Sequence, residues 1–268
     1  MKHEEDAALD ENIATFVSSF AEHIKNIASI EVSRNAKRYK KILYVTALEG
    51  IAKTRYPNPN KSSRDRFVKL VHKCGNWTDA ERISLPHLVA ALERTSNARV
   101  EPLREFAYSE LRDWGSGGPI YLDRDPTLSK IQALWPKDEK GALIAIDDVR
   151  SQLQTLRHVD MLYAYRNYLV HESRQPTVGF EEGDDVAPFY ESVNMHPTIF
   201  GNKVSEWHLV YPVGFLEQLC NRCLSSLEEY LMANKKDPYL SFKDGWHLVE
   251  HFNNDEKFPV VRPFYQSV

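Results

Sequence analysis

The chain has 268 residues and a net charge of -4, with 42% hydrophobic residues, 27% charged residues and 11 glycines. This composition suits one globular domain with elaborations, or two small ones, and argues against a wholly disordered chain. The first thirty residues are acidic and polar between their apolar positions, and no later window is apolar for long enough to cross a bilayer, so we expect a cytoplasmic protein without a leader or membrane contact.

The charge is distributed unevenly along the chain. The segment from Val32 to Lys73 contains twelve basic and two acidic residues, a net charge of +10, which leaves -14 for the remaining residues. A local cationic face can attract phosphates even in an acidic protein, although an ordinary solvated surface has the same composition. The basic residues that we consider as phosphate-binding candidates are Arg34, Lys37, Arg38, Lys40, Lys41, Arg64 and Arg66.

Helical periodicity dominates the first half of the chain. A first helix is predicted with Asp10 at its N-cap, and a second from about Asn35 to Thr54. A third helix is expected to start near Ser63, and a fourth to cover Leu85 to Trp114 with an interruption around Pro102.

The second half is expected to mix elaborations with two further helices. A Gly- and Pro-rich break begins an insertion around 114–146, and a long amphipathic helix runs from Asp147 until Pro176 ends it. Two alternating segments predict a β-hairpin around 188–212, before a helix over Phe215–Met232 and an aromatic tail, 237–268. We therefore expect one mostly α-helical domain spanning 1–268, with a small β-hairpin inserted before its last long helix.

Two motifs with possible metal or redox chemistry have better structural explanations. "HLVEH" at His247–His251 has the spacing of an inverted zinc-protease motif, but too few residues follow it to supply the further carboxylate ligand. "CNRC" at Cys220 and Cys223 lies within an apolar helix and has no second pair to complete a metal site. We expect Cys74, Cys220 and Cys223 to be reduced thiols, since their number is odd and no leader precedes them.

Polar side chains interrupt the apolar stretch "YAYRNYLVH" near the end of the long helix. Asn167 and His171 are four residues apart and therefore share a face, which extends back to Ala164 and Asp160. Arg166 projects about 100 degrees from Asn167, and its side chain is long enough to reach the same cleft. An apolar helix face thus becomes polar where an Arg, an Asn and a His can converge.

Arg and His at similar spacing also occur by chance. A proline between Arg82 and His87 would break a helix that held both side chains. In the pair Arg66 and His72, the residue directly after the arginine is not polar. For Arg166 and His171, a simpler alternative remains open, in which a helix end uses these side chains to bind its carbonyls or the acidic loop that follows.

The sequence "RNYLVH" resembles the motif of the HEPN superfamily (higher eukaryotes and prokaryotes nucleotide-binding domains). Many members are metal-independent ribonucleases of toxin, phage-defence and RNA-processing systems, built as small helical bundles. The resemblance covers this one motif and the general helical order. It implies that Arg166, Asn167 and His171 are catalytic and that no cofactor or metal is needed. Some relatives carry a tyrosine two residues after the histidine, where this chain has Ser173, so the nucleotidylation of that tyrosine is not expected here.

The chemistry of these three side chains agrees with that implication. An imidazole can take the proton from a 2'-hydroxyl or protonate the leaving oxygen, a guanidinium can hold the phosphate oxygens, and an amide can orient either. Such a reaction needs no metal and leaves a 2',3'-cyclic phosphate. As supporting residues we consider Glu49, Asp160 and Tyr163, while the basic candidates named above would bind the RNA.

One histidine cannot readily serve as base and acid in the same step. The resemblance implies a homodimer, in which two copies contribute to a composite site, and it allows an antitoxin or sensor partner. The alternative function is a HEPN-like module that binds nucleotides or a protein without catalysis. A third possibility, a helical adaptor unrelated to RNA, predicts no affinity for polyanions.

Overall fold

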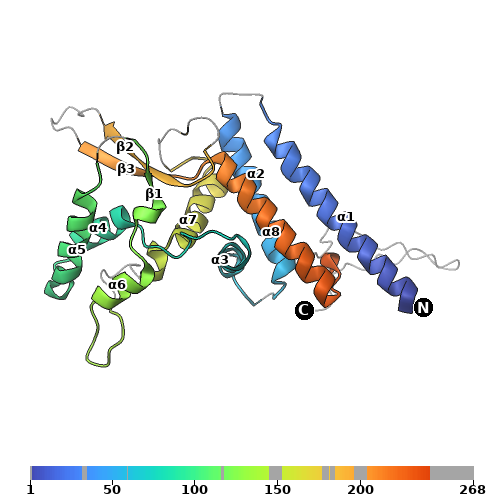
Figure 1. The fold of residues 1–268 in the computed structure, drawn as a ribbon, viewed down its shortest axis with the longest axis horizontal. Helices are drawn as coiled ribbons and strands as arrows, with labels where there is room; N and C mark the ends of the chain where they lie inside the picture. The colour runs from blue at the N-terminus through green and yellow to red at the C-terminus, as the bar shows by residue number, and fades with distance from the viewer. Residues whose placement is uncertain are drawn as a thin grey trace, which may run out of the picture.

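The computed structural model describes residues 2–31, 35–58, 60–115, 118–144, 153–176, 181, 185–195 and 204–241. The fold is mostly helical, with one small antiparallel sheet. Its α-helices are α1 (Lys2–Ala28), α2 (Ala36–Arg55), α3 (Ser63–Cys74), α4 (Leu85–Glu93), α5 (Glu101–Arg112), α6 (Leu128–Leu134), α7 (His158–His171) and α8 (Val213–Asn234). In Figure 1, α1, α2 and α8 lie side by side on the right, and the sheet lies with α4 and α5 on the left.

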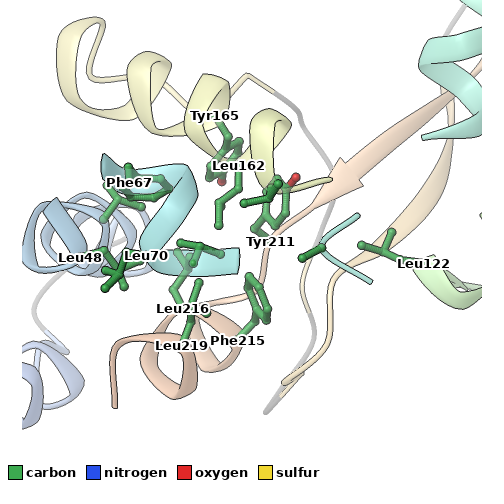
Figure 2. Packing of buried hydrophobic residues seen from close by; sticks show 14 of the residues in the cluster. Leu48, Phe67, Leu70, Leu122, Leu162, Tyr165, Tyr211, Phe215, Leu216 and Leu219 are labelled. Atoms are coloured by element: carbon green, nitrogen blue, oxygen red, sulfur yellow. The ribbon is translucent and has the colours of Figure 1, made fainter. Parts of the chain in front are cut away.

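The main core lies where α2, α3, α7 and α8 meet. Leu48 of α2, Phe67 of α3, Leu162 of α7 and Leu216 of α8 are all fully buried there (Figure 2). These residues recur at helical spacing in the sequence, so each helix turns an apolar face inward. The packing fixes α7 against α2 and α3, which is the arrangement that positions the side chains described below.

Gly75 follows α3 at a point where the backbone has no room for a side chain. A Cβ atom at this position would lie 2.5 Å from the carbonyl oxygen of Val71 and 2.6 Å from Cδ1 of Leu219 on α8. We expect Gly75→Ala to lower the free energy of unfolding by about 1–3 kcal/mol in urea denaturation, as overpacked cores do. Gly115→Ala is the matched control, because no other atom of the described residues lies within 4 Å of the added atom. Equal stability of the two variants would contradict this close packing.

The predicted helix over Leu85–Trp114 is divided. The chain forms α4, a short 3-10 turn over Ala98–Val100, and then α5, with Pro102 in the first turn of α5. A proline fits there because the first N–H groups of a helix have no partner within the helix. The predicted helices over Asn35–Thr54 and Phe215–Met232 are confirmed to within a few residues, whereas the first helix starts at Lys2, ahead of its expected cap.

The long helix predicted from Asp147 starts later than expected. Residues 145–152 lie outside the described part of the chain, Leu153–Leu156 forms a 3-10 turn, and α7 begins only at His158. The backbone before α7 pairs instead with the segment that precedes α4: Ser84 N–H donates to Leu156 O, and His158 N–H donates to Arg82 O. These non-helical hydrogen bonds explain the late start.

The predicted hairpin is confirmed and has an additional neighbour. Strands β2 (Phe189–Met195) and β3 (Val204–Val210) pair antiparallel, with Tyr190 opposite Leu209. The two-residue strand β1 (Ile120–Tyr121), from the predicted insertion, pairs with β2 to give the order β1-β2-β3. A strand this short has no period that the sequence could reveal.

Both cysteines of "CNRC" belong to the core. Cys220 and Cys223 of α8 are fully buried, and burial raises the pKa of both thiols well above the ordinary value. Their interpretation as core residues is confirmed, since a buried thiol with a raised pKa is poorly reactive. The other motif, His247–His251, lies outside the described residues.

Candidate functional site

Three side chains converge at the end of α7. The guanidinium Nη1 of Arg166 lies 2.9 Å from Oδ1 of Asn167 and 2.9 Å from Nε2 of His171. Helical geometry accounts for this meeting, because Asn167 and His171 are stacked on adjacent turns and the long side chain of Arg166 reaches across to both. His171 is the last residue of α7 and is exposed, whereas Arg166 is 8% exposed.

Glu49 of α2 holds the other side of the guanidinium. Its Oε2 accepts a hydrogen bond from Nη2 of Arg166, in an ion pair that joins α2 to α7. The second carboxylate oxygen of Glu49 and Nε of Arg166 are also buried, and neither has a hydrogen-bond partner within the described chain. The guanidinium is thus fixed in one orientation, with some hydrogen-bonding capacity left over.

The contact between Arg166 and His171 determines where the imidazole proton lies. A guanidinium has only N–H donors, so Nε2 of His171 must accept, and the neutral ring carries its proton on Nδ1. Arg166 therefore occupies the lone pair with which His171 could act as a base. A ligand that attracts the guanidinium would free this lone pair of His171.

A cationic pocket of about 450 Å³ lies next to Arg166, between α2 and the start of α3. Arg166, Lys53 and Arg66 line it together with Ser63, and among its described lining residues Glu49 alone is acidic. Arg66 is held there by hydrogen bonds to Asn58 O (3.3 Å) and to Oγ of Ser63 (3.2 Å). The pocket presents a positive surface to an anion that approaches Arg166.

Sequence reasoning missed Lys53 and Ser63 as lining residues. Lys53 lies four residues after Glu49 on the same face of α2, a spacing that gives a signal once Glu49 is considered. Ser63 begins α3, and no pattern in the sequence distinguishes it from Ser62 directly before it.

The sequence predicts Asp160 as a supporting residue of the site, but in the structure its carboxylate pairs with two other arginines. One carboxylate oxygen binds Arg64 of α3, and the other binds Arg157, with Nη2 at 2.7 Å and Nε at 2.8 Å. No contact with Arg166 or His171 is found for it. Asp160 thus fixes α7 to α3, and it neutralises Arg64, one of the predicted RNA-binding candidates. Tyr163 packs against Phe67 and also lies under the guanidinium, with its ring centroid 5.8 Å from Cζ of Arg166.

The basic residues of α2 do not form one binding face. Lys41 is 1% exposed and pairs with Glu181 at 2.5 Å, so we correct its assignment as an RNA-binding candidate: its ammonium is buried, and burial lowers its pKa. Lys37 donates to the carbonyl oxygen of Glu181, and Lys40 to that of Ala28. Arg38 is partly buried near the start of α2, with Cζ 5.5 Å from the ring centroid of Tyr39.

Of the seven basic candidates, the structure brings Arg66 to the pocket beside Arg166. Arg34 lies outside the described residues. Lys37 and Lys40 instead line a separate hollow at the start of α8, together with Glu181 and Glu217.

No family model matches the chain, and neither the curated proteins nor the solved structures contain a significant match. In the described part of the chain, no group of three or more His, Cys, Asp or Glu residues is arranged to hold a metal ion. None of the described helices combines the length and the apolar composition that a membrane span requires.

Proposed function

We propose that the protein is an endoribonuclease of the HEPN type, which cleaves RNA through Arg166, Asn167 and His171. The observation that carries this proposal is the position of one guanidinium group. It lies 2.9 Å from both the Asn167 amide oxygen and the His171 imidazole, beside a cationic pocket. An anion binder next to an acid–base group is what the transesterification of RNA requires.

The contacts of Arg166 suggest how substrate starts the reaction. A phosphodiester that enters the pocket competes for the guanidinium, and this competition frees Nε2 of His171. The imidazole then removes the 2'-hydroxyl proton, O2' attacks phosphorus, and the bond to O5' breaks. The products are a 2',3'-cyclic phosphate and a 5'-hydroxyl, which receives a proton from an acid. Arg166 stabilises the charge that develops on the non-bridging oxygens.

A second copy of the chain is the proposed source of that acid. His171 is exposed at the end of α7, so this end of the helix is available to another molecule. Two-fold pairing through it would bring two Arg–His pairs to one site, and one imidazole would act as the base and the other as the acid. The toxin or defence role, with an antitoxin or sensor partner, stays a prediction from the resemblance.

Non-catalytic binding is the second candidate, and a specific observation favours it. Arg166 is 8% exposed, and its Nη1 and Nη2 groups are engaged by Glu49, Asn167 and His171 of the same chain. If a ligand cannot displace these contacts of Arg166, the side chains of Arg166, Asn167 and His171 are structural or bind a ligand without reaction.

Incubation of the purified protein with mixed-sequence single-stranded RNA in EDTA tests the proposal. We expect the wild type to cleave and Arg166→Lys to lose about 10²- to 10³-fold in rate, because lysine keeps the charge but not the two-sided donor geometry. Intact RNA with both proteins, while the wild type still binds it, would favour the non-catalytic module.

Arg66 is expected to contribute to RNA affinity by neutralising one phosphate. We expect Arg66→Ala to weaken binding at low salt and to reduce the slope of log K against log salt by about 0.7, the value for one phosphate of a single strand. Arg99→Ala is the matched control, since Arg99 is exposed in the 3-10 turn before α5, away from this pocket. Fluorescence anisotropy at several salt concentrations measures both slopes. Equal slopes for the two variants would show that Arg66 does not contact an RNA phosphate.

A further inference from the structure

A second pocket lies on the opposite flank of α7 and shares no lining residue with the first. Its volume is about 430 Å³, within the range of small-molecule sites. Among the described residues that line it are His87 of α4, Tyr165 and Tyr168 of α7, Tyr211 and Arg174. The pocket thus combines aromatic rings with an imidazole and with a guanidinium whose Nε also pairs with Glu172 at 2.5 Å.

Tyr168 and Arg174 form the more exposed part of this pocket. Tyr168 is 36% exposed, Cζ of Arg174 lies 4.7 Å from its ring centroid, and the Arg174 N–H donates to Tyr168 O. Tyr165 is 5% exposed, and its buried hydroxyl has no hydrogen-bond partner among the residues described. A buried hydroxyl without a partner is uncommon in proteins, and here it belongs to a residue that lines a cavity.

His87 is oriented by a chain of buried hydrogen bonds. Oδ2 of Asp125 lies 2.6 Å from Nε2 of His158 and 2.9 Å from the Tyr190 hydroxyl. That hydroxyl lies 2.6 Å from Oγ of Ser84, which in turn lies 2.7 Å from Nδ1 of His87. Leu85 N–H donates to the other oxygen of Asp125, at 2.8 Å.

The carboxylate sets the direction of the protons along this chain. A carboxylate only accepts, so Tyr190 gives Asp125 its single proton, and Ser84 must then donate to Tyr190. The Ser84 oxygen is left to accept from Nδ1–H of His87. Nε2 of the neutral His87 ring therefore carries a lone pair and is an acceptor for an N–H group in the pocket.

We infer that this pocket binds a single nucleotide, with its base against Tyr168 and an N–H edge on Nε2 of His87. The phosphate then lies toward Arg174. All four RNA bases offer an N–H edge and a face that can stack on an aromatic ring. Tyr168 lies one turn before His171 on α7, and Arg174 lies three residues after it, so the nucleotide next to the cleaved phosphate is within reach. This inference rests on the proposed function for its choice of RNA as the source of the nucleotide.

Binding can be measured without cleavage. Saturation-transfer NMR with the four nucleoside 5'-monophosphates, and anisotropy with a labelled 2'-O-methyl RNA, which cannot undergo transesterification, would be run on the full chain. We expect Tyr168→Ala to weaken binding by about 5- to 150-fold, as the loss of a base-stacking contact does. We expect His87→Ala to weaken it by about 2- to 12-fold, as the loss of one neutral hydrogen bond does. Tyr121→Ala and His23→Ala are the matched controls, since both residues are exposed and neither lines the pocket.

The outcomes separate this inference from the proposed function. Binding that depends on Tyr168 and His87 supports the pocket even if the unmodified RNA is never cleaved. In that case, mononucleotides that bind as tightly as the oligomer identify a free nucleotide as the ligand, and tighter binding of the oligomer identifies RNA. Unchanged binding in both variants, or equal losses in the controls, overturns the inference even if the wild type cleaves RNA.

Discussion

Replacing His171 by alanine is expected to lower the rate of RNA cleavage by about 10²- to 10⁴-fold, the usual contribution of one acid–base group. In a composite site, the variant loses this group from both copies. His171 is exposed at the end of α7, so the free energy of unfolding should change by less than about 0.5 kcal/mol. Initial cleavage rates on a labelled single-stranded RNA, together with urea denaturation, measure the two effects separately.

His23→Ala is the control for the histidine substitution, because His23 is exposed on α1 and has no place in the site. It should cleave at the wild-type rate. If His171→Ala also cleaves at that rate, His171 is not the acid or the base. If activity falls only in proportion to the folded fraction, the role of His171 is structural.

Asp125→Ala is expected to lower the free energy of unfolding by about 3–5 kcal/mol, because it removes the carboxylate from a fully buried network. His158 and Tyr190 are both 0% exposed and would each lose the same partner. The Leu85 N–H, at the start of α4, would lose its acceptor as well. The carboxylate thus joins the predicted insertion to α4, α7 and β2.

Chemical denaturation of Asp125→Ala beside Asp123→Ala measures this contribution. Asp123 is exposed two residues earlier, so its removal should leave stability within about 0.5 kcal/mol of the wild type. Asp125→Asn should fall between the wild type and Asp125→Ala, since an amide oxygen still accepts but carries no charge. An Asp125→Ala variant as stable as its control would contradict a structural role for the network.

The sequence predicted the helices of the core well, because their apolar residues repeat at helical spacing. It failed where the tertiary structure decides. Nothing in the composition of Leu153–Leu156 indicates that the backbone next to it pairs with the segment before α4, and this pairing delays α7 until His158. The two-residue strand β1 exists because β2 lies beside it.

At the site, spacing within one helix was informative and charge alone was not. The four-residue separation of Asn167 and His171 correctly indicated that they share a face, and Arg166 reaches both. A run of basic residues indicates only a cationic segment. The structure distributes these side chains, so that Lys41 is buried against Glu181, Arg64 is held by Asp160, and Arg66 reaches the pocket. Such pairings join positions far apart in the chain, which no local pattern specifies.

The most direct test of the central claim is the chemistry of the RNA ends. Fragments produced by the wild type in EDTA would be analysed by mass spectrometry, beside the products of His171→Ala. We predict 2',3'-cyclic phosphate and 5'-hydroxyl ends from the wild type and almost no fragments from the variant. Fragments with 3'-hydroxyl and 5'-phosphate ends, or equal fragmentation by both proteins, would contradict a transesterification that depends on Arg166 and His171.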